Sequence, residues 1–152
     1  MSNRFYAVCG ILDIDGKILF VRHTYGAAKE RILIPGGYVK EGDLPSESVR
    51  RELLEETGVI AEAESVFAVQ FRKEQWIIVF RLRYISGEPR SDGYENSEVL
   101  LLTPEEAVKR SDITNMSRAI LNAYIDQKDN TLERGSYNSI SLKDETFEIF
   151  GV

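Results

Sequence analysis

A glycine pair, an acidic loop and a charged amphipathic segment follow one another in residues 36–59, which read GGYVKEGDLPSESVRRELLEETGV. The segment Leu44–Thr57 is predicted to form a helix. Asp43 is a favoured N-cap residue, and Pro45 falls in the first turn, where a missing N–H costs little. Gly58 stands where helices commonly end. This stretch therefore predicts a helix with sharply defined ends directly after a glycine-rich loop.

Three carboxylates of this predicted helix share one face. Glu52, Glu55 and Glu56 are three and four residues apart, and such like-charged pairs destabilise a helix by about 0.2–0.5 kcal/mol each. A solvated acidic surface explains three glutamates when they are taken alone. A cation that neutralised the three glutamates would be Mg²⁺ or Mn²⁺, because carboxylate oxygens suit these ions. Arg51 can reach Glu55 one turn on and hold that carboxylate in place.

The flanking sequence alternates between strand and helix patterns. A β-hairpin is predicted from Phe5–Asp13 and Lys17–His23, because Asp15-Gly16 is a typical tight turn. A short apolar piece, 32–34, is stopped by Pro35 and the two glycines. Further strands are predicted at Val66–Arg72, Trp76–Ser86 and Glu98–Leu102, and a capping box at Thr103–Glu106 and a last helix at Ser111–Ile125 follow. This order predicts an α/β (α+β) sandwich and excludes a helical bundle.

Composition limits the class of protein. The chain has 152 residues and a net charge of −6, which argues against a protein that coats nucleic acid. One cysteine, Cys9, excludes an intramolecular disulfide and a cysteine-rich zinc site. No stretch is typical of a signal peptide or a membrane span, so a cytoplasmic location without membrane contact is expected. We predict one domain over residues 1–126 and a C-terminal extension over 127–152 that packs on it or on a partner subunit.

The segment resembles the Nudix box of MutT-like hydrolases. That motif places a glycine, a glutamate, an Arg-Glu pair, an apolar residue, a Glu-Glu pair, a glycine and an apolar residue at fixed spacing. The matching residues here are Gly37, Arg51, Glu52, Leu53, Glu55, Glu56, Gly58 and Val59. Asp43 stands where the family has glutamate. Because Asp43 is one methylene shorter, the resemblance leaves open whether it reaches a metal.

The resemblance implies a Nudix-type α/β/α sandwich with a mixed sheet. It also implies hydrolysis of a nucleoside diphosphate derivative with Mg²⁺ or Mn²⁺, by attack of water on phosphorus. Glu55 and Glu56 would be the principal metal ligands, and Glu52 a further ligand or the general base. Arg51 would orient the glutamates, and the Gly36 carbonyl would complete the ligand set. The catalytic residues would thus be Glu52, Arg51 and Glu55.

Residues outside the motif are weaker candidates. One more acid is expected to reach the metals from a loop; Glu98 is favoured slightly over Glu95, and Glu74 ranks below both. Arg22 and Arg31 are candidates for phosphate binding, and Trp76 for stacking on a base. For each of these, an ordinary surface charge or a core aromatic is the simpler explanation.

Two other functions stay open at this point. A nucleotide-binding sensor that keeps the fold but has weak turnover is suggested by Asp43, although three intact glutamates argue against it. Removal of the 5′ diphosphate from RNA is disfavoured by the net charge. The expected partner is a small nucleotide, and the aromatic residues of the C-terminal segment lead to the hypothesis of a homodimer.

Overall fold

Strand β1 (Tyr6–Ile14) lies at the centre of the fold. The computed structural model describes residues 4–143 and 147–152. β1 pairs in parallel with β6 (Trp76–Ser86) along most of its length. On its other side it pairs antiparallel, first with β4 (Gly36–Tyr38) and then, at Asp13 and Ile14, with β2 (Lys17–His23). The sheet is therefore mixed, as the sequence predicts.

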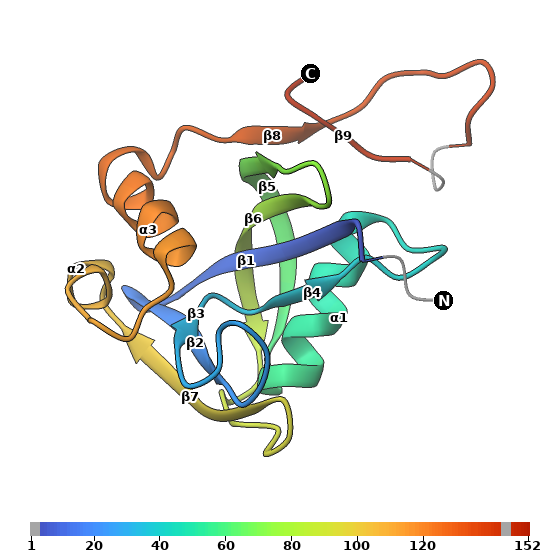
Figure 1. Cartoon of the computed structure of the whole chain (residues 1–152). Coiled ribbons are helices and arrows are strands. Elements are labelled where there is room, and N and C mark those ends of the chain that lie inside the picture. Colours follow the sequence, from blue (N-terminus) through green and yellow to red (C-terminus); the bar gives the residue numbers. More distant parts are fainter. Residues whose placement is uncertain (1–3, 144–146) are drawn as a thin grey trace.

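The other strands extend this sheet in both directions. β5 (Ile60–Phe71) pairs antiparallel with β6, while β3 (Ile32–Leu33) and β7 (Asn96–Leu102) both pair with β2. Helix α1 (Pro45–Thr57) covers one side. Helices α2 (Pro104–Val108) and α3 (Asn115–Gln127) lie on the other (Figure 1). This arrangement is the α/β/α sandwich expected from the sequence.

Two apolar layers hold the sandwich together, because successive side chains of a strand point to opposite faces. Val8 and Leu12 of β1 belong to the layer that also contains Val49 and Leu53 of α1. Ile11, between them in sequence, belongs to the layer under α3. Helix α1 is thus attached to the centre of the sheet by its own buried face.

The structure corrects several element boundaries. Leu44, not Asp43, is the N-cap of α1, and the Asp43 carboxylate instead accepts a hydrogen bond from Ser48 Oγ at 2.8 Å. The sequence predicts that Pro35 and the two glycines stop the strand at 32–34. In the structure, Gly36 and Gly37 instead form a further strand that pairs with β1. β5 begins earlier than predicted, and α3 begins at Asn115, where Thr114 accepts from the Ser117 N–H.

The C-terminal segment adds two further strands. β8 (Leu132–Gly135) pairs antiparallel with β5, and β9 (Ile149–Phe150) pairs antiparallel with β8. The Phe150 ring lies 5.8 Å from that of Phe80, edge to face. The segment therefore contacts the same chain's core. Within the described residues, every helix falls short of the length and apolar character that a bilayer crossing needs.

Candidate active site

Three acidic side chains meet beside α1. One carboxylate oxygen from each of Glu52, Glu56 and Glu95 lies within 4.8 Å of the other two. Glu52 and Glu56 are one helical turn apart, so α1 presents them together. Glu95 comes from the loop before β7 and approaches them from outside the helix. The cluster therefore joins two segments that are about 40 residues apart in sequence.

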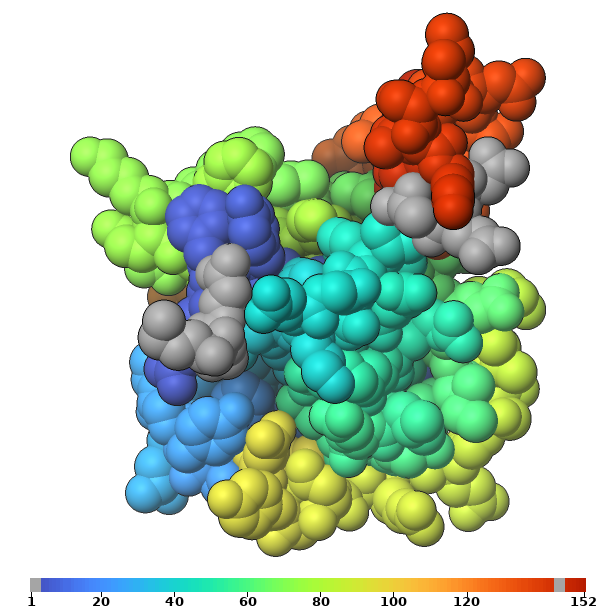
Figure 2. Space-filling view, turned by 90° about the vertical axis from the view of Figure 1, so that its right-hand side faces the viewer, coloured from blue at the N-terminus to red at the C-terminus, as the bar shows by residue number. Residues whose placement is uncertain are grey.

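Hydrogen bonds fix the loop that carries Glu95. The Asp92 carboxylate accepts from the backbone N–H groups of Tyr94 and Asn96, at 2.9 and 3.1 Å. The buried Asn96 side chain donates to the Glu56 carbonyl at 2.8 Å. Asp92 thus shapes the turn, as aspartate often does, and Asn96 ties it to the end of α1. Figure 2 shows this loop, in yellow, against the lower end of α1.

Glu56 is the most buried member of the cluster. Its side chain is buried, the residue is 3% exposed, and Oε2 has no hydrogen-bond partner among the described residues. Burial, together with the charges of Glu52 and Glu95, raises the pKa of Glu56 to about 9, and a hydrogen bond with the Gly36 backbone opposes this rise. Burial also raises the pKa of Glu52, against the effect of Arg51.

This donor set fits a divalent cation. A buried carboxylate oxygen without a partner is costly, and a hard cation is the ligand that carboxylate oxygens prefer. Each carboxylate of the cluster also repels the other two. A cation between Glu52, Glu56 and Glu95 removes both penalties, so the residues present match the metal that the sequence implies.

Arg51 contacts the cluster from the side. Its Nη1 lies 3.1 Å from Glu52 Oε1 and 3.5 Å from Glu55 Oε2, and its Nε lies 3.5 Å from Asp43 Oδ2. The guanidinium thus contacts three acids at once, and the orienting role expected of it stays a prediction. Glu55 itself has a side chain that is 59% exposed and lies outside the three-acid cluster.

The two glycines of β4 bring the backbone against the acids. A Cβ on Gly37 would overlap the Glu52 carboxylate, and a Cβ on Gly36 would overlap the Val8 carbonyl oxygen. No other residue type fits either position without a shift of backbone or of Glu52. The ligand role predicted for the Gly36 carbonyl stays a prediction, although Gly36 lies beside Glu56.

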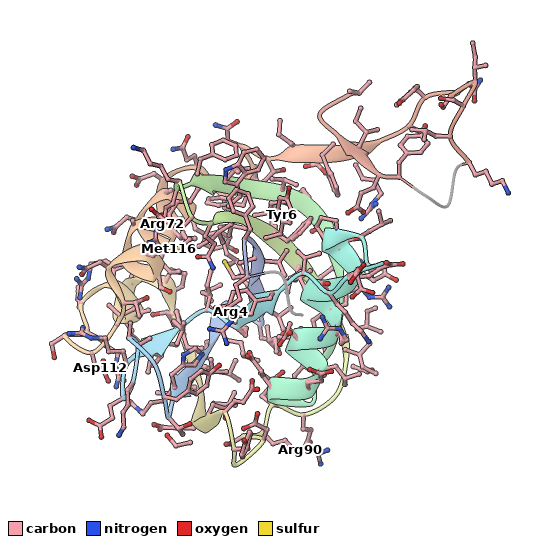
Figure 3. The ribbon with its side chains drawn as sticks, turned by 45° about the vertical axis from the view of Figure 1, so that its right-hand side comes forward. Arg4, Tyr6, Arg72, Arg90, Asp112 and Met116 are labelled. Carbon is pink, nitrogen blue, oxygen red and sulfur yellow. The ribbon has the colours of Figure 1, made fainter. Side chains whose placement is uncertain are left out.

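A pocket of about 220 Å³ opens next to these glycines. Gly36, Gly37 and Tyr38 form one wall, and Met116 and Ile120 of α3 form another. Figure 3 shows Met116 on the α3 side of the molecule. The Tyr25 ring stacks on His23 at the entrance, with 5.2 Å between centroids and an interplanar angle of 12°. An apolar pocket with an aromatic pair at its entrance, beside an acidic cluster, suits a flat apolar group attached to a phosphate.

The structure does not bring Glu98 to the cluster. Its carboxylate pairs with Arg22 Nε at 2.9 Å, and Arg22 Nη1 also pairs with Asp112 at 3.0 Å. Asp112 lies far from α1, on the opposite side of the view in Figure 3. The sequence favours Glu98 over Glu95, and the geometry reverses that order. Glu98 lies within β7 opposite Arg22 of β2, whereas Glu95 lies in the loop before β7.

The predicted substrate residues also lie outside the pocket lining. Arg22 is engaged by two acids, and Arg31 is exposed on the surface. The Trp76 ring packs against Phe5, Tyr6 and Phe71. Its sequence neighbours Gln75 and Ile77 line the pocket, so Trp76 points to the other face of the strand.

Comparison with known proteins identifies the family to which this fold belongs. The family model described as the NUDIX domain matches residues 3–124, so the chain belongs to the Nudix hydrolase family, a family of enzymes. It is 36% identical over 88 residues to the ADP-ribose pyrophosphatase of Methanocaldococcus jannaschii, over 54% of this chain and 52% of that protein. It is also 32% identical over 98 residues to a MutT-like protein of Streptomyces ambofaciens, over 63% and 61% of the two chains.

A third relative is the RNA pyrophosphohydrolase of Bartonella bacilliformis, 29% identical over 109 residues, which cover 66% of this chain and 64% of that protein. The chain thus spans about half to two thirds of the length of these curated relatives. Among solved structures, a NUDIX hydrolase from Nitrosomonas europaea superposes with a TM-score of 0.75 at 21% identity, over 84% of this chain and 73% of the other. That likeness shows the shared fold.

Proposed function

We propose that this protein hydrolyses a diphosphate bond in a small nucleoside diphosphate derivative and depends on Mg²⁺ or Mn²⁺. The observation that carries the proposal is the cluster of Glu52, Glu56 and Glu95, with its buried and unpartnered Glu56 oxygen, next to the glycines that line an apolar pocket. A sensor without turnover would have no use for three acids held this closely against like-charge repulsion.

Each residue of the site has a distinct task in this proposal. Glu52, Glu56 and Glu95 would hold the cation, and the Gly36 carbonyl would add a neutral oxygen. When bound, the cation would neutralise the diphosphate and lower the pKa of a water molecule. Glu52 is also the candidate base, because it lies at the open edge of the cluster and its pKa is raised by burial. Arg51 keeps Glu52 and Glu55 oriented.

The pocket supports a nucleotide as the substrate. It lies directly beside the two glycines, so a base seated between Tyr38 and α3 would carry its phosphates past Gly37 to the acids. The ring pair of Tyr25 and His23 offers a stacking surface at the entrance. The names of the relatives, an ADP-ribose pyrophosphatase and an RNA pyrophosphohydrolase, indicate which substrates to test first.

Hydrolysis of a substrate panel tests the proposal. The panel contains ADP-ribose, nucleoside triphosphates, dinucleoside polyphosphates, nucleotide sugars, NADH and 5′-triphosphorylated RNA, each with Mg²⁺, with Mn²⁺ and with chelator. We expect cleavage of a small nucleotide that stops when the cation is removed. Reaction in H₂¹⁸O should place the heavy oxygen on a phosphate product.

Two results would count against this proposal. Cleavage at full rate in chelator would show that the reaction does not need the cation. Ligand-induced stabilisation in a thermal shift assay, without cleavage of any substrate in the panel, would favour the nucleotide-binding sensor. Cleavage of the RNA alone would instead support the second enzymatic alternative.

A further inference from the structure

The first turn of α1 lacks a cap of its own. The N-cap residue, Leu44, has an apolar side chain that accepts no hydrogen bond, and Pro45 has no N–H. The Glu47 carboxylate reaches back to the Leu44 N–H at 2.7 Å and so serves only the residue before the helix. The Ser46 N–H, which an ordinary N-cap side chain would satisfy, needs an acceptor from elsewhere.

Glu148, from the C-terminal segment, is that acceptor. Its Oε1 accepts from the Ser46 N–H at 3.2 Å, and its Oε2 accepts from Ser46 Oγ at 2.7 Å. The side chain is only 9% exposed, so this carboxylate is buried at the start of the helix. A negative charge at this end also interacts favourably with the helix dipole. A residue 102 positions away therefore caps α1.

The segment around Glu148 is anchored on the sheet. Arg134 of β8 donates from Nη1 to Glu148 Oε2 at 3.0 Å and from Nη2 to the Ala63 carbonyl of β5 at 3.2 Å. Its guanidinium also lies over the Phe150 ring, 4.8 Å from the centroid. Phe150 packs on Phe80 of the core. Figure 2 shows this C-terminal segment, in red, above the upper end of α1.

A continuous set of contacts leads from the capped turn to the acids. Ser48, two residues after Ser46, donates to the Asp43 carboxylate, which lies 3.5 Å from Arg51 Nε. Arg51 in turn pairs with Glu52. Loosening the first turn would displace Asp43 relative to Arg51, and so release the group that orients Glu52.

We propose that Glu148 is a positioning residue for the acidic cluster: by capping α1 it holds the turn from which Asp43 and Arg51 orient Glu52. The residue lies beyond the stretch matched by the NUDIX family model, so the device belongs to this chain's own C-terminal segment. The capping step stands on the geometry alone, whereas the effect on the cation rests on the proposed function.

The test combines hydrogen exchange with metal titration. In cation-free protein, Glu148→Ala should raise amide exchange in the first two turns of α1 by about 2- to 30-fold, the range that corresponds to loss of an N-cap. Mn²⁺ binding, followed by calorimetry, should weaken by about 10-fold, as for other changes beside metal ligands. Glu148→Gln, which keeps the shape of the side chain, should give smaller changes in the same direction.

A rescue variant separates capping from general destabilisation. Leu44 already has the extended backbone of an N-cap, with φ −72° and ψ 152°. Leu44→Asp therefore supplies a local cap, and in the Glu148→Ala background it should restore both slow exchange and Mn²⁺ affinity. Glu133→Gln is the control within the same segment, because the Glu133 side chain contacts Thr131 and not α1.

Ile18→Val serves as a second control, since it weakens the apolar layer on the other face without contacting α1. It should lower the melting temperature and leave Mn²⁺ affinity unchanged.

Unchanged amide exchange in α1 of Glu148→Ala would overturn the inference, as would failure of Leu44→Asp to restore slow exchange and Mn²⁺ affinity in that background. Absence of Mn²⁺ binding in the wild-type protein would instead overturn the proposed function and leave the exchange result as the test of capping.

Discussion

Glu56 is the residue at which the need for a cation is greatest. It is buried among acids of the same sign, and one of its oxygens has no partner among the described residues. The change Glu56→Gln should lower turnover by about 100-fold or more, because it removes a proposed direct ligand. Without cation, the variant should be at least as stable as the wild type, since it replaces a carboxyl group whose charged form is disfavoured by burial and by Glu52 and Glu95.

Steady-state rates with Mg²⁺ and melting curves in chelator measure these two effects. Near-normal turnover of Glu56→Gln would contradict its assignment as a ligand. A large loss of stability without cation would show that the carboxylate has a structural partner instead.

Glu95 and Glu98 form a matched pair for a second prediction. Glu95→Gln should weaken Mn²⁺ binding by about 10- to 100-fold, because Glu95 lies in the cluster. Glu98→Gln should leave Mn²⁺ binding unchanged and cost only about 0–1 kcal/mol of stability, because it loses a solvent-exposed ion pair with Arg22. Calorimetric titration of both variants compares them directly, and the opposite ranking would restore Glu98 as the ligand.

At the scale of secondary-structure elements, the site depends on the contact between β4 and α1. α1 rests its apolar face on the sheet and presents its acids toward β4, which approaches through two glycines. Because a Cβ on Gly37 would overlap the Glu52 carboxylate, the closeness of strand and helix depends on that glycine. The site is therefore built by the packing of two elements as much as by α1 alone.

Gly37→Ala is accordingly expected to displace Glu52 and lower turnover by about 100-fold, the effect of misplacing a reacting group by roughly 1 Å. The overall fold should persist, because the glycine lies at the surface of the core and its φ is not positive. Turnover and circular dichroism of Gly37→Ala check this. Gly16→Ala is the control: it lies in open space in the turn between β1 and β2, away from the acidic cluster, so only its positive φ is strained. Wild-type turnover in Gly37→Ala would show that Glu52 has room to move.

At the scale of the whole molecule, an ion network joins β2, β7 and the segment before α3. Asp112 is paired with Arg110 at 2.8 Å and with Arg22 at 3.0 Å, and Arg22 also pairs with Glu98. The hydrogen bonds from Arg110, and then from Arg22, hold the pKa of Asp112 well below its usual range. This network supports the α3 side of the pocket without lining it.

A lowered pKa in the folded state makes the stability depend on pH. The contribution of Asp112 is present above its unfolded pKa, about 4, and is lost as the pH falls through the lower folded value. Asp112→Asn should therefore cost about 1 kcal/mol at pH 7, a figure reduced for partial exposure to solvent. The difference from wild type should narrow below about pH 4. Urea unfolding at pH 7, 4 and 2 measures it, and a constant difference would exclude this linkage.

Local patterns in the sequence predicted much of the fold. The end of α1 at Gly58 and the placing of Glu52 and Glu56 on one face follow from a glycine with φ +74° and from helical spacing, which both act within a few residues. The hairpin at the start follows from its turn in the same way. The family's motif added the chemistry of the site, because it fixes residue types at fixed spacing within one element and its approach loop.

Tertiary structure decided the contacts between segments that lie far apart. Glu95 joins the cluster because the loop held by Asp92 carries it there, whereas Glu98 lies within β7 and pairs with Arg22. The cap on α1 comes from Glu148, more than 100 residues from Ser46, so no local rule identifies it and Asp43 was the natural local choice. Sequence periodicity determines which face a side chain takes within its own element. Only the pairing of strands and the docking of the C-terminal segment determine which side chains of different elements meet.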